Sequence, residues 1–370
     1  MLNSTFFLTQ ASTWSLTYMF LFIYLTFVFS LVLYLVSSVK EFTNNTLFNY
    51  ISGADVVWVV LTPLLLTTLV NFSWTSPVLT AWFGHILFSA FQQKITYFII
   101  IFFTLVWLSY SSSFYYSSQE VYDYTIVTYS FFLWTTFLFY SNNLFTVIFF
   151  IEILSTLITL LLITSVFSST YFYNNLSLTN HSYFNQSTPF AFLQTLMFFF
   201  WISLVSSLNL FIFLTLFYLK FLTFDWFTLE SIFSYVIAVS DLKSIFYISL
   251  VWFNFLFCIF IKCGLVPFYF WKPVFFKGIP LHALFFYIFF YYFFIFYFFI
   301  YFFVVYLNEL FYFNIFVNLI MLTSGLLFLV FIICESYYLK AFLAMSSILN
   351  TLFVFLAMSS YSCTDYIFIL

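Results

Sequence analysis

The sequence predicts an all-α polytopic membrane protein, and three observations carry this prediction. The chain has 370 residues, of which 65% are hydrophobic and only 5% are charged, whereas a soluble domain carries about 25% charged residues. Its mean hydropathy is +1.14. Apolar runs of spanning length recur along the chain without the polar alternation that a membrane β-barrel needs. We therefore expect a multi-pass helical protein in contact with membrane lipids.

The residue usage is biased toward lysine and aromatic side chains. All eight basic residues are lysines, and there are 67 Phe and 30 Tyr but only five Gly. This bias is typical of an AT-rich organellar genome, so a stripe of aromatic residues indicates apolar filling rather than a site. The N-terminal "MLNSTFFLTQASTWS" has neither a basic signal region nor an Arg-rich transit peptide, as expected for synthesis inside an organelle.

The cysteines and the net charge argue against several kinds of site. Cys258, Cys263, Cys334 and Cys363 form no CxxC motif and no Cys/His cluster with metal-ligand spacing. The net charge is −3, and no Gly-rich phosphate loop is present. We therefore expect no metal, no iron–sulfur cluster, no structural disulfide and no nucleic-acid partner.

Windows of about 20 mostly apolar residues, separated by polar clusters, predict ten or eleven membrane-spanning helices. The short window at 78–90 is expected to be a half-helix or an interfacial segment. The predicted segments are 16–37, 54–72, 78–90, 95–112, 124–141, 144–167, 190–218, 244–268, 281–306, 310–334 and 338–360.

Two polar connections interrupt these segments. The Asn-rich interval 168–189 is predicted to be an extramembrane loop. The interval 220–243 concentrates charge and is expected to lie at the membrane interface; its charged residues are Lys220, Asp225, Glu230, Asp241 and Lys243.

Glu152 is the first of two ionisable candidates that stand out inside apolar segments. Ser155, Thr156 and Thr159 follow at positions that share its helical face. A charge at membrane depth costs several kcal/mol, so this polar stripe should face protein or water. A packing role as an interhelical hydrogen-bonding group is the alternative.

Lys262 is the second such residue, in the stretch "IKCGLVPFYFWKPVFFKGIPLH". Pro267 removes a backbone donor and clashes one turn back, and Gly264 adds freedom, so we predict a broken helix there. Burial favours the neutral amine, and a nearby carboxylate favours the ammonium. A buried Lys–Glu pair would suit proton transfer, whereas a lysine that snorkels to the headgroups is the alternative.

The stretch "KCGLVPFYFWKPVFFKGIPL" resembles the pattern K-x-G-x-x-P-F-H-x-W-x-P-x-x-x-x-G-x-P of the antiporter-like subunits of respiratory complex I. Within these it is most similar to the subunit 2 family of NADH:ubiquinone oxidoreductase. Two further stretches agree with this family: "YSNNLFTVIFFIEILS" (140–155) with its fifth-helix motif, and "LKAFLAMSSILN" (339–350) with its tenth-helix motif.

The resemblance implies an antiporter-like helix bundle in the membrane arm of a proton-pumping, quinone-reducing enzyme of the mitochondrial inner membrane. It divides the chain into N-terminal helices at 1–123 and an antiporter-like core at 124–370. Glu152 and Lys262 then match the family's paired glutamate and lysine, whose charge state is thought to gate proton uptake. NADH, FMN, iron–sulfur clusters and ubiquinone are expected elsewhere in the complex, with other membrane-arm subunits as partners.

The sequence departs from the family in two ways. The family's second lysine, on the next helix, is matched here by Tyr292, and no lysine lies between Gly278 and Leu339. Tyr291, Tyr292 and His282 are therefore the possible relay residues. The chain also stops at Leu370, before the family's later helices, so we expect a reduced or split subunit. Three accounts stay open: the remaining helices are encoded as a separate polypeptide, the subunit conducts protons through water and the hydroxyls of Tyr291 and Tyr292, or it has lost pumping and serves as a spacer.

Three functions remain open at this point. The chain is a subunit of complex I that contributes to proton translocation or only spaces its neighbours; it is a cation/proton antiporter that shares the fold; or it is a membrane scaffold without transport.

Overall fold

The computed structural model describes residues 79–81, 84–88, 92, 94–96, 98–99, 101–103, 119–176, 189–239, 242–265, 268–279, 281–295, 297–298, 315–333 and 339–358. The chain divides into two compact units, Met1–Phe150 and Ile151–Leu370, and each is described by itself. The predicted segments 16–37 and 54–72 lie outside the described residues. The division of the core at 123/124, which came from the resemblance, stays a prediction.

A β-hairpin is the main departure from prediction in the first unit. Strands β1 (Leu79–Ala81) and β2 (Ile86–Phe88) pair antiparallel, so the half-helix predicted for 78–90 is wrong. The turn contains Gly84 at φ 89°, a conformation that favours glycine. The bonds that hold it come from far along the chain, because the Asn142 amide donates to Gly84 O at 2.8 Å and its backbone N–H to His85 O at 2.9 Å.

The rest of the described chain is almost entirely helical, which confirms the all-α polytopic fold. Three stretches are long and apolar enough to cross a membrane, namely Leu144–Ser165, Phe192–Phe221 and Ile245–Cys263. The helices are α4 (Gln119–Tyr140), α5 (Leu144–Leu176), α6 (Pro189–Phe221), α7 (Trp226–Val239), α8 (Leu242–Cys263), α9 (Trp271–Gly278), α10 (Leu281–Phe286), η2 (Tyr287–Tyr292), α13 (Ile315–Ile333) and α14 (Leu339–Met358).

Several predicted boundaries need correction. Helix α5 continues to Leu176, so the first part of the predicted loop 168–189 is helical; residues 177–188 lie outside the described part. Helix α8 ends at Cys263 rather than at residue 268. Helix α7 lies inside the interval 220–243, which was predicted not to span the membrane. It has 14 residues, and a helix of this length, about 21 Å, is too short to cross a membrane.

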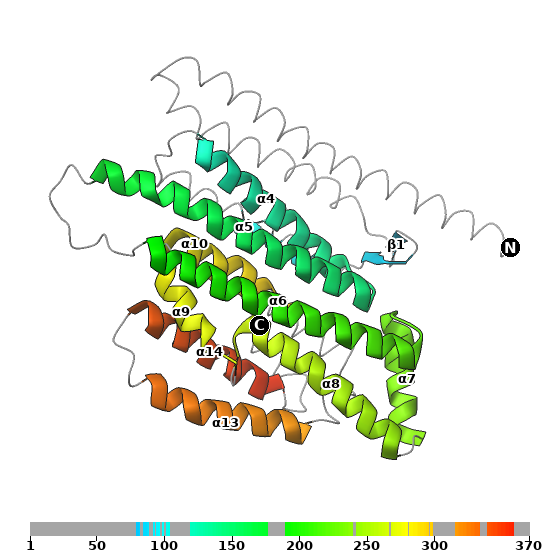
Figure 1. Cartoon of the computed structure of the whole chain (residues 1–370). Helices are drawn as coiled ribbons and strands as arrows, with labels where there is room; N and C mark the ends of the chain where they lie inside the picture. The colour runs from blue at the N-terminus through cyan, green and yellow to red at the C-terminus, as the bar shows by residue number, and fades with distance from the viewer. Residues whose placement is uncertain are drawn as a thin grey trace, which may run out of the picture. The chain divides into compact units, whose positions relative to one another are not determined.

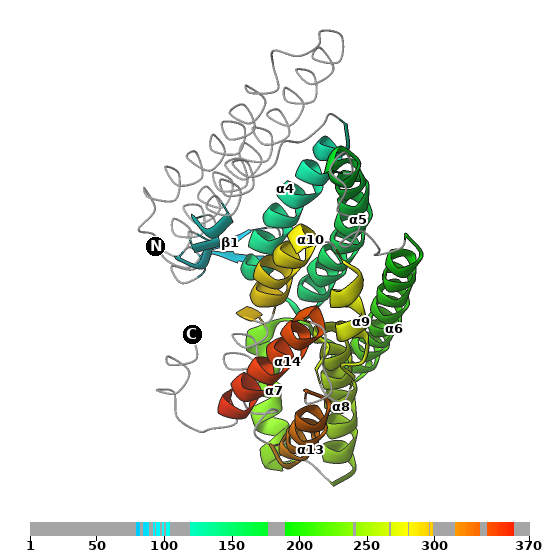
Figure 2. The same cartoon turned by 90° about the vertical axis from the view of Figure 1, so that its left-hand side faces the viewer.

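Aromatic side chains hold the helices of the second unit together. Helices α6 and α8 lie side by side, with α7 at one end (Figure 1), and Phe213 stacks on Phe255 between them at 4.6 Å. On the other part of α6, Phe199 stacks on Phe275 of α9 at 4.7 Å. Helix α14 packs against α9 and α13, as Figure 2 shows from a second side. The short helix α9 is thereby enclosed by α6 and α14.

Helix α8 ends in a Schellman motif. Gly264 takes the left-handed conformation with φ +62°. Its N–H donates to Ile261 O at 3.2 Å, and the Leu265 N–H donates to Phe260 O at 2.8 Å, which is the bond pattern of this cap. The predicted helix break is therefore present, and the glycine produces it; Pro267 lies outside the described residues.

Replacing Gly264 with alanine should destabilise the protein. A side chain at this φ costs about 1–2 kcal/mol, and a Cβ here would lie 3.0 Å from Lys272 Cδ and 3.1 Å from Trp271 Cζ2. We expect Gly264→Ala to lower the melting temperature in lipid nanodiscs. Gly84→Ala is the matched control, because Gly84 also has positive φ but its Cβ would meet nothing within 4 Å. An equal decrease of the melting temperature in the two variants would mean that the close packing around Gly264 adds nothing to the cost of the substitution.

Candidate functional site

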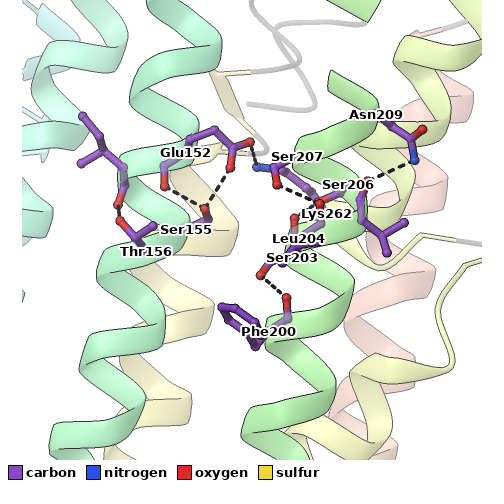
Figure 3. Close-up of polar contacts among 12 residues, drawn as sticks. Glu152, Ser155, Thr156, Phe200, Ser203, Leu204, Ser206, Ser207, Asn209 and Lys262 are labelled. Carbon is purple, nitrogen blue, oxygen red and sulfur yellow. Dashed lines mark hydrogen bonds and ion pairs between the residues drawn. The ribbon is translucent and has the colours of Figure 1, made fainter. Parts of the chain in front are cut away.

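The structure brings Glu152 of α5 and Lys262 of α8 together as an ion pair (Figure 3). The two residues are far apart in the sequence, and each comes from an apolar helix. The Lys262 side chain is 4% exposed and that of Glu152 is 21% exposed. Lys262 stands in the last turn of α8, where a cation also interacts favourably with the helix dipole. The lysine is thus paired and does not reach toward an aqueous surface.

The polar stripe predicted beside Glu152 contributes only one residue to the pair. Ser155 is buried, and its hydroxyl lies 2.8 Å from Glu152 O and 3.5 Å from Glu152 Oε2. Thr156 is exposed and bonds Ile153 O at 2.8 Å. The hydroxyl of Thr159 donates to Thr156 O at 2.7 Å. The two threonines therefore satisfy their hydroxyls within their own helix.

Helix α6 adds three serines to the group drawn in Figure 3. Ser203, Ser206 and Ser207 donate to carbonyls one turn earlier in the same helix, at 2.8, 2.7 and 2.9 Å. Ser206 is fully buried. Because each hydroxyl donates within its own helix, its oxygen keeps acceptor capacity toward a water molecule or a neighbouring donor.

Two side chains after the break reach carbonyl groups in the last turn of α8. Trp271 Nε1 donates to Ile261 O at 3.1 Å, and Lys272 Nζ lies 3.5 Å from Cys263 O. Lys272 is fully buried, and its ammonium lies 3.6 Å from the centroid of the Tyr292 ring. Lys272 was not among the site residues predicted from the sequence. Its place directly after a broken helix was the available signal.

The predicted relay tyrosines lie in the π-helical turn η2. Tyr291 and Tyr292 are buried, and the Tyr292 hydroxyl donates to Thr351 of α14 at 3.0 Å. Tyr287 stacks on Tyr291 at 5.3 Å. The backbone of His282 lies in α10, but its side chain is outside what the structure describes.

Helix α14, which carries the third motif of the resemblance, is fastened to α9. Lys340 Nζ donates to Ile279 O at 2.7 Å, just past the end of α9. Lysine side chains commonly satisfy the last carbonyls of a helix in this way. Lys340 and Thr351 therefore hold the segment from α9 to η2 at two points.

The ionisable groups near the break are one carboxylate and two lysines, Glu152, Lys262 and Lys272. Of the two lysines, only Lys262 has an ion-pair partner among the described residues. Within the same residues, no group of three metal-ligating side chains comes together.

A comparison with solved structures finds the same arrangement of helices in another protein. The neighbour is a chain in the structure of respiratory complex I from Thermus thermophilus with bound aureothin, with a TM-score of 0.56 and 14% identity. The chain shares its fold with this subunit. The match covers 89% of the present chain and 64% of the neighbour, which is less than two thirds of its length. No protein-family model and no curated protein matches the sequence.

Replacing Glu152 and replacing Lys262 should lower the free energy of unfolding by different amounts. Glu152→Gln leaves the nearly inaccessible Lys262 without its carboxylate, whereas Lys262→Met leaves the more exposed Glu152. Breaking a buried pair typically costs about 3–5 kcal/mol, so we expect a loss of this order for Glu152→Gln and a smaller one for Lys262→Met. The double variant should lose less than the sum, as measured by a double-mutant cycle on thermal unfolding in nanodiscs. Additive losses would show that the pair does not stabilise the fold.

Proposed function

We propose that this chain is a membrane-arm subunit of a proton-pumping NADH:quinone oxidoreductase and that Glu152 and Lys262 couple it to proton movement. The observation that carries the proposal is the ion pair between two apolar helices at the end of a broken helix. The fold shared with a chain of respiratory complex I supports it.

The chemistry of the pair fits such a role. When the carboxylate and the ammonium are in contact, each stabilises the charge of the other. When they separate, burial favours the neutral amine, and the lysine can give up its proton. A movement of α5 against α8, or a charge arriving nearby, therefore changes the proton affinity of Lys262. This is the property that a coupling element needs.

The finer assignment follows the sequence resemblance. The three motifs favour subunit 2 of the mitochondrial enzyme, in the inner membrane and encoded by the organelle. On this assignment, other membrane-arm subunits are the partners. The flavin, the iron–sulfur clusters and the quinone are bound elsewhere in the complex, and this chain carries no redox site.

A non-pumping spacer in the same complex is the second candidate, and one observation favours it. The hydroxyls of Ser203, Ser206 and Ser207 all donate within their own helix, so none of these three protons is directed at the pair. In this case Glu152 and Lys262 would join α5 to α8 and would not change their charge. An autonomous cation/proton antiporter is the third candidate.

Isolation of the native membrane complex tests membership. We expect the chain to co-migrate with NADH:quinone reductase activity on a native gel, because a subunit without a redox site needs the rest of the enzyme. An unrelated organellar membrane protein of similar size serves as control. The chain running alone, or in a complex without this activity, would contradict the proposal and favour the antiporter.

Replacement of Lys262 separates pumping from spacing. In coupled vesicles, Lys262→Met should lower the number of protons moved per NADH oxidised while the amount of assembled complex stays largely unchanged. Lys220→Met is the matched control, since Lys220 is an exposed lysine at the end of α6. An unchanged ratio in Lys262→Met would support the spacer and remove the coupling role.

A further inference from the structure

Lys272 is a fully buried lysine that the ion pair does not use. It stands at the second position of α9, next to the break, and its relative exposure is 0%. Its closest aromatic partner is Tyr292, whose ring centroid lies 3.6 Å from Nζ. A cation this close to a ring face is attracted by the ring quadrupole, more strongly where water is excluded.

The remaining partners of Lys272 are weak. Cys263 O lies at 3.5 Å, which is the long limit of a hydrogen bond. Within the part of the chain that the structure describes, no carboxylate forms an ion pair with this lysine. A permanently charged ammonium without a counter-ion is unfavourable at such a site, whereas the neutral amine costs much less.

The elements that contact or adjoin α9 are α6, α8, α10, η2 and α14. None of their titratable residues is a carboxylate; they are Tyr218 and Lys220 of α6, Lys243, Tyr247, Cys258, Lys262 and Cys263 of α8, His282 of α10, Tyr287, Tyr291 and Tyr292 of η2, and Lys340 of α14. Lys340 is bonded to Ile279 O. Lys262 immediately precedes Cys263 in α8, and Lys272 Nζ lies 3.5 Å from Cys263 O, so both lysines belong to the end of this helix.

We propose that Lys272 is a second proton-holding site of this bundle, with the ring of Tyr292 as the group that stabilises its charged form. This inference rests on the proposed function and deepens it. A proton released by the Lys262 ammonium leaves a neutral amine there and converts the Lys272 amine into an ammonium over the ring. When that proton leaves, Lys272 returns to the neutral amine. Tyr292 is a positioning residue in this scheme, since it gains and loses no proton.

The hydroxyl of Tyr292 holds the ring in place for this task. It donates to Thr351 of α14 at 3.0 Å, and the Thr351 hydroxyl lies 2.8 Å from Ile348 O in its own helix. The hydroxyl of Tyr292 is thus bonded to α14, and the face of its ring lies against Lys272. The alternative is a purely structural lysine that helps to cap the Cys263 carbonyl.

The first experiment reads the protonation of Lys272 directly in the full chain in lipid. Nζ is labelled with nitrogen-15, and with eight lysines in the chain the Lys272 signal is assigned by its loss in Lys272→Met. We expect this signal to change between amine and ammonium as the pH is varied down to about 5, where documented buried lysines still titrate. Tyr292→Leu should increase the amine fraction at a given pH, and Tyr291→Leu, a buried tyrosine of the same turn, should not. A signal fixed in one state, or equal effects of the two variants, would overturn the proposal.

The second experiment measures protons moved per NADH oxidised in the assembled complex. Lys272→Met should lower the ratio, and Lys272→Arg should not restore it, because the guanidinium keeps its proton while it can still donate to Cys263 O. Restoration by Lys272→Arg would show a capping role only and would overturn the proposal. Lys277→Met is the control, since Lys277 is the exposed lysine of the same helix.

The two proposals fail in different ways. If Lys262→Met lowers the number of protons moved per NADH oxidised and Lys272→Met leaves it unchanged, only the proposed second site is overturned. An unchanged ratio in both variants overturns the coupling role of the pair and the second site with it.

Discussion

The second unit depends on one backbone constraint, the end of helix α8 inside an apolar bundle. A helix that stops there leaves carbonyl groups that water cannot easily reach. Gly264 turns the chain by the Schellman motif, and the chain returns as α9 with Trp271 donating to Ile261 O. The same ending places Lys262 in the last turn of α8 and brings Lys272 back against the carbonyl of Cys263. The polar site is therefore a consequence of where the helix stops.

The two lysines at this helix end are accommodated in different ways. Lys262 has a carboxylate partner, and the pair is tolerated because each charge offsets part of the desolvation cost of the other. Lys272 has a ring face and a distant carbonyl, which together stabilise an ammonium less than a carboxylate does. The first arrangement favours the charged pair, and the second leaves the charged and neutral forms closer in free energy.

Residues that break the apolar pattern were the ones that could be predicted. Glu152, Lys262 and the helix break could be predicted from the sequence, because an ionisable group or a glycine is unusual inside an apolar segment and indicates a specific role there. The hairpin around Gly84 was missed, since its bonds come from Asn142, more than fifty residues away. Lys272 was missed because proline and glycine near it indicated only a turn. The π-helical turn η2 has no compositional mark, as an extra residue per turn leaves an all-aromatic segment looking unchanged.

A few of the many aromatic residues have a specific structural role. Of the two buried lysines among the described residues, Lys262 is paired with a carboxylate and Lys272 lies against a ring. Most of the tyrosines and phenylalanines fill space, but Tyr292 has its hydroxyl fixed by Thr351 and its face fixed against Lys272. Helix α14 controls both, because Thr351 anchors the ring and Lys340 holds the end of α9 at Ile279. A displacement of α14 would therefore change the stabilisation of an ammonium at Lys272 without touching the Glu152–Lys262 pair.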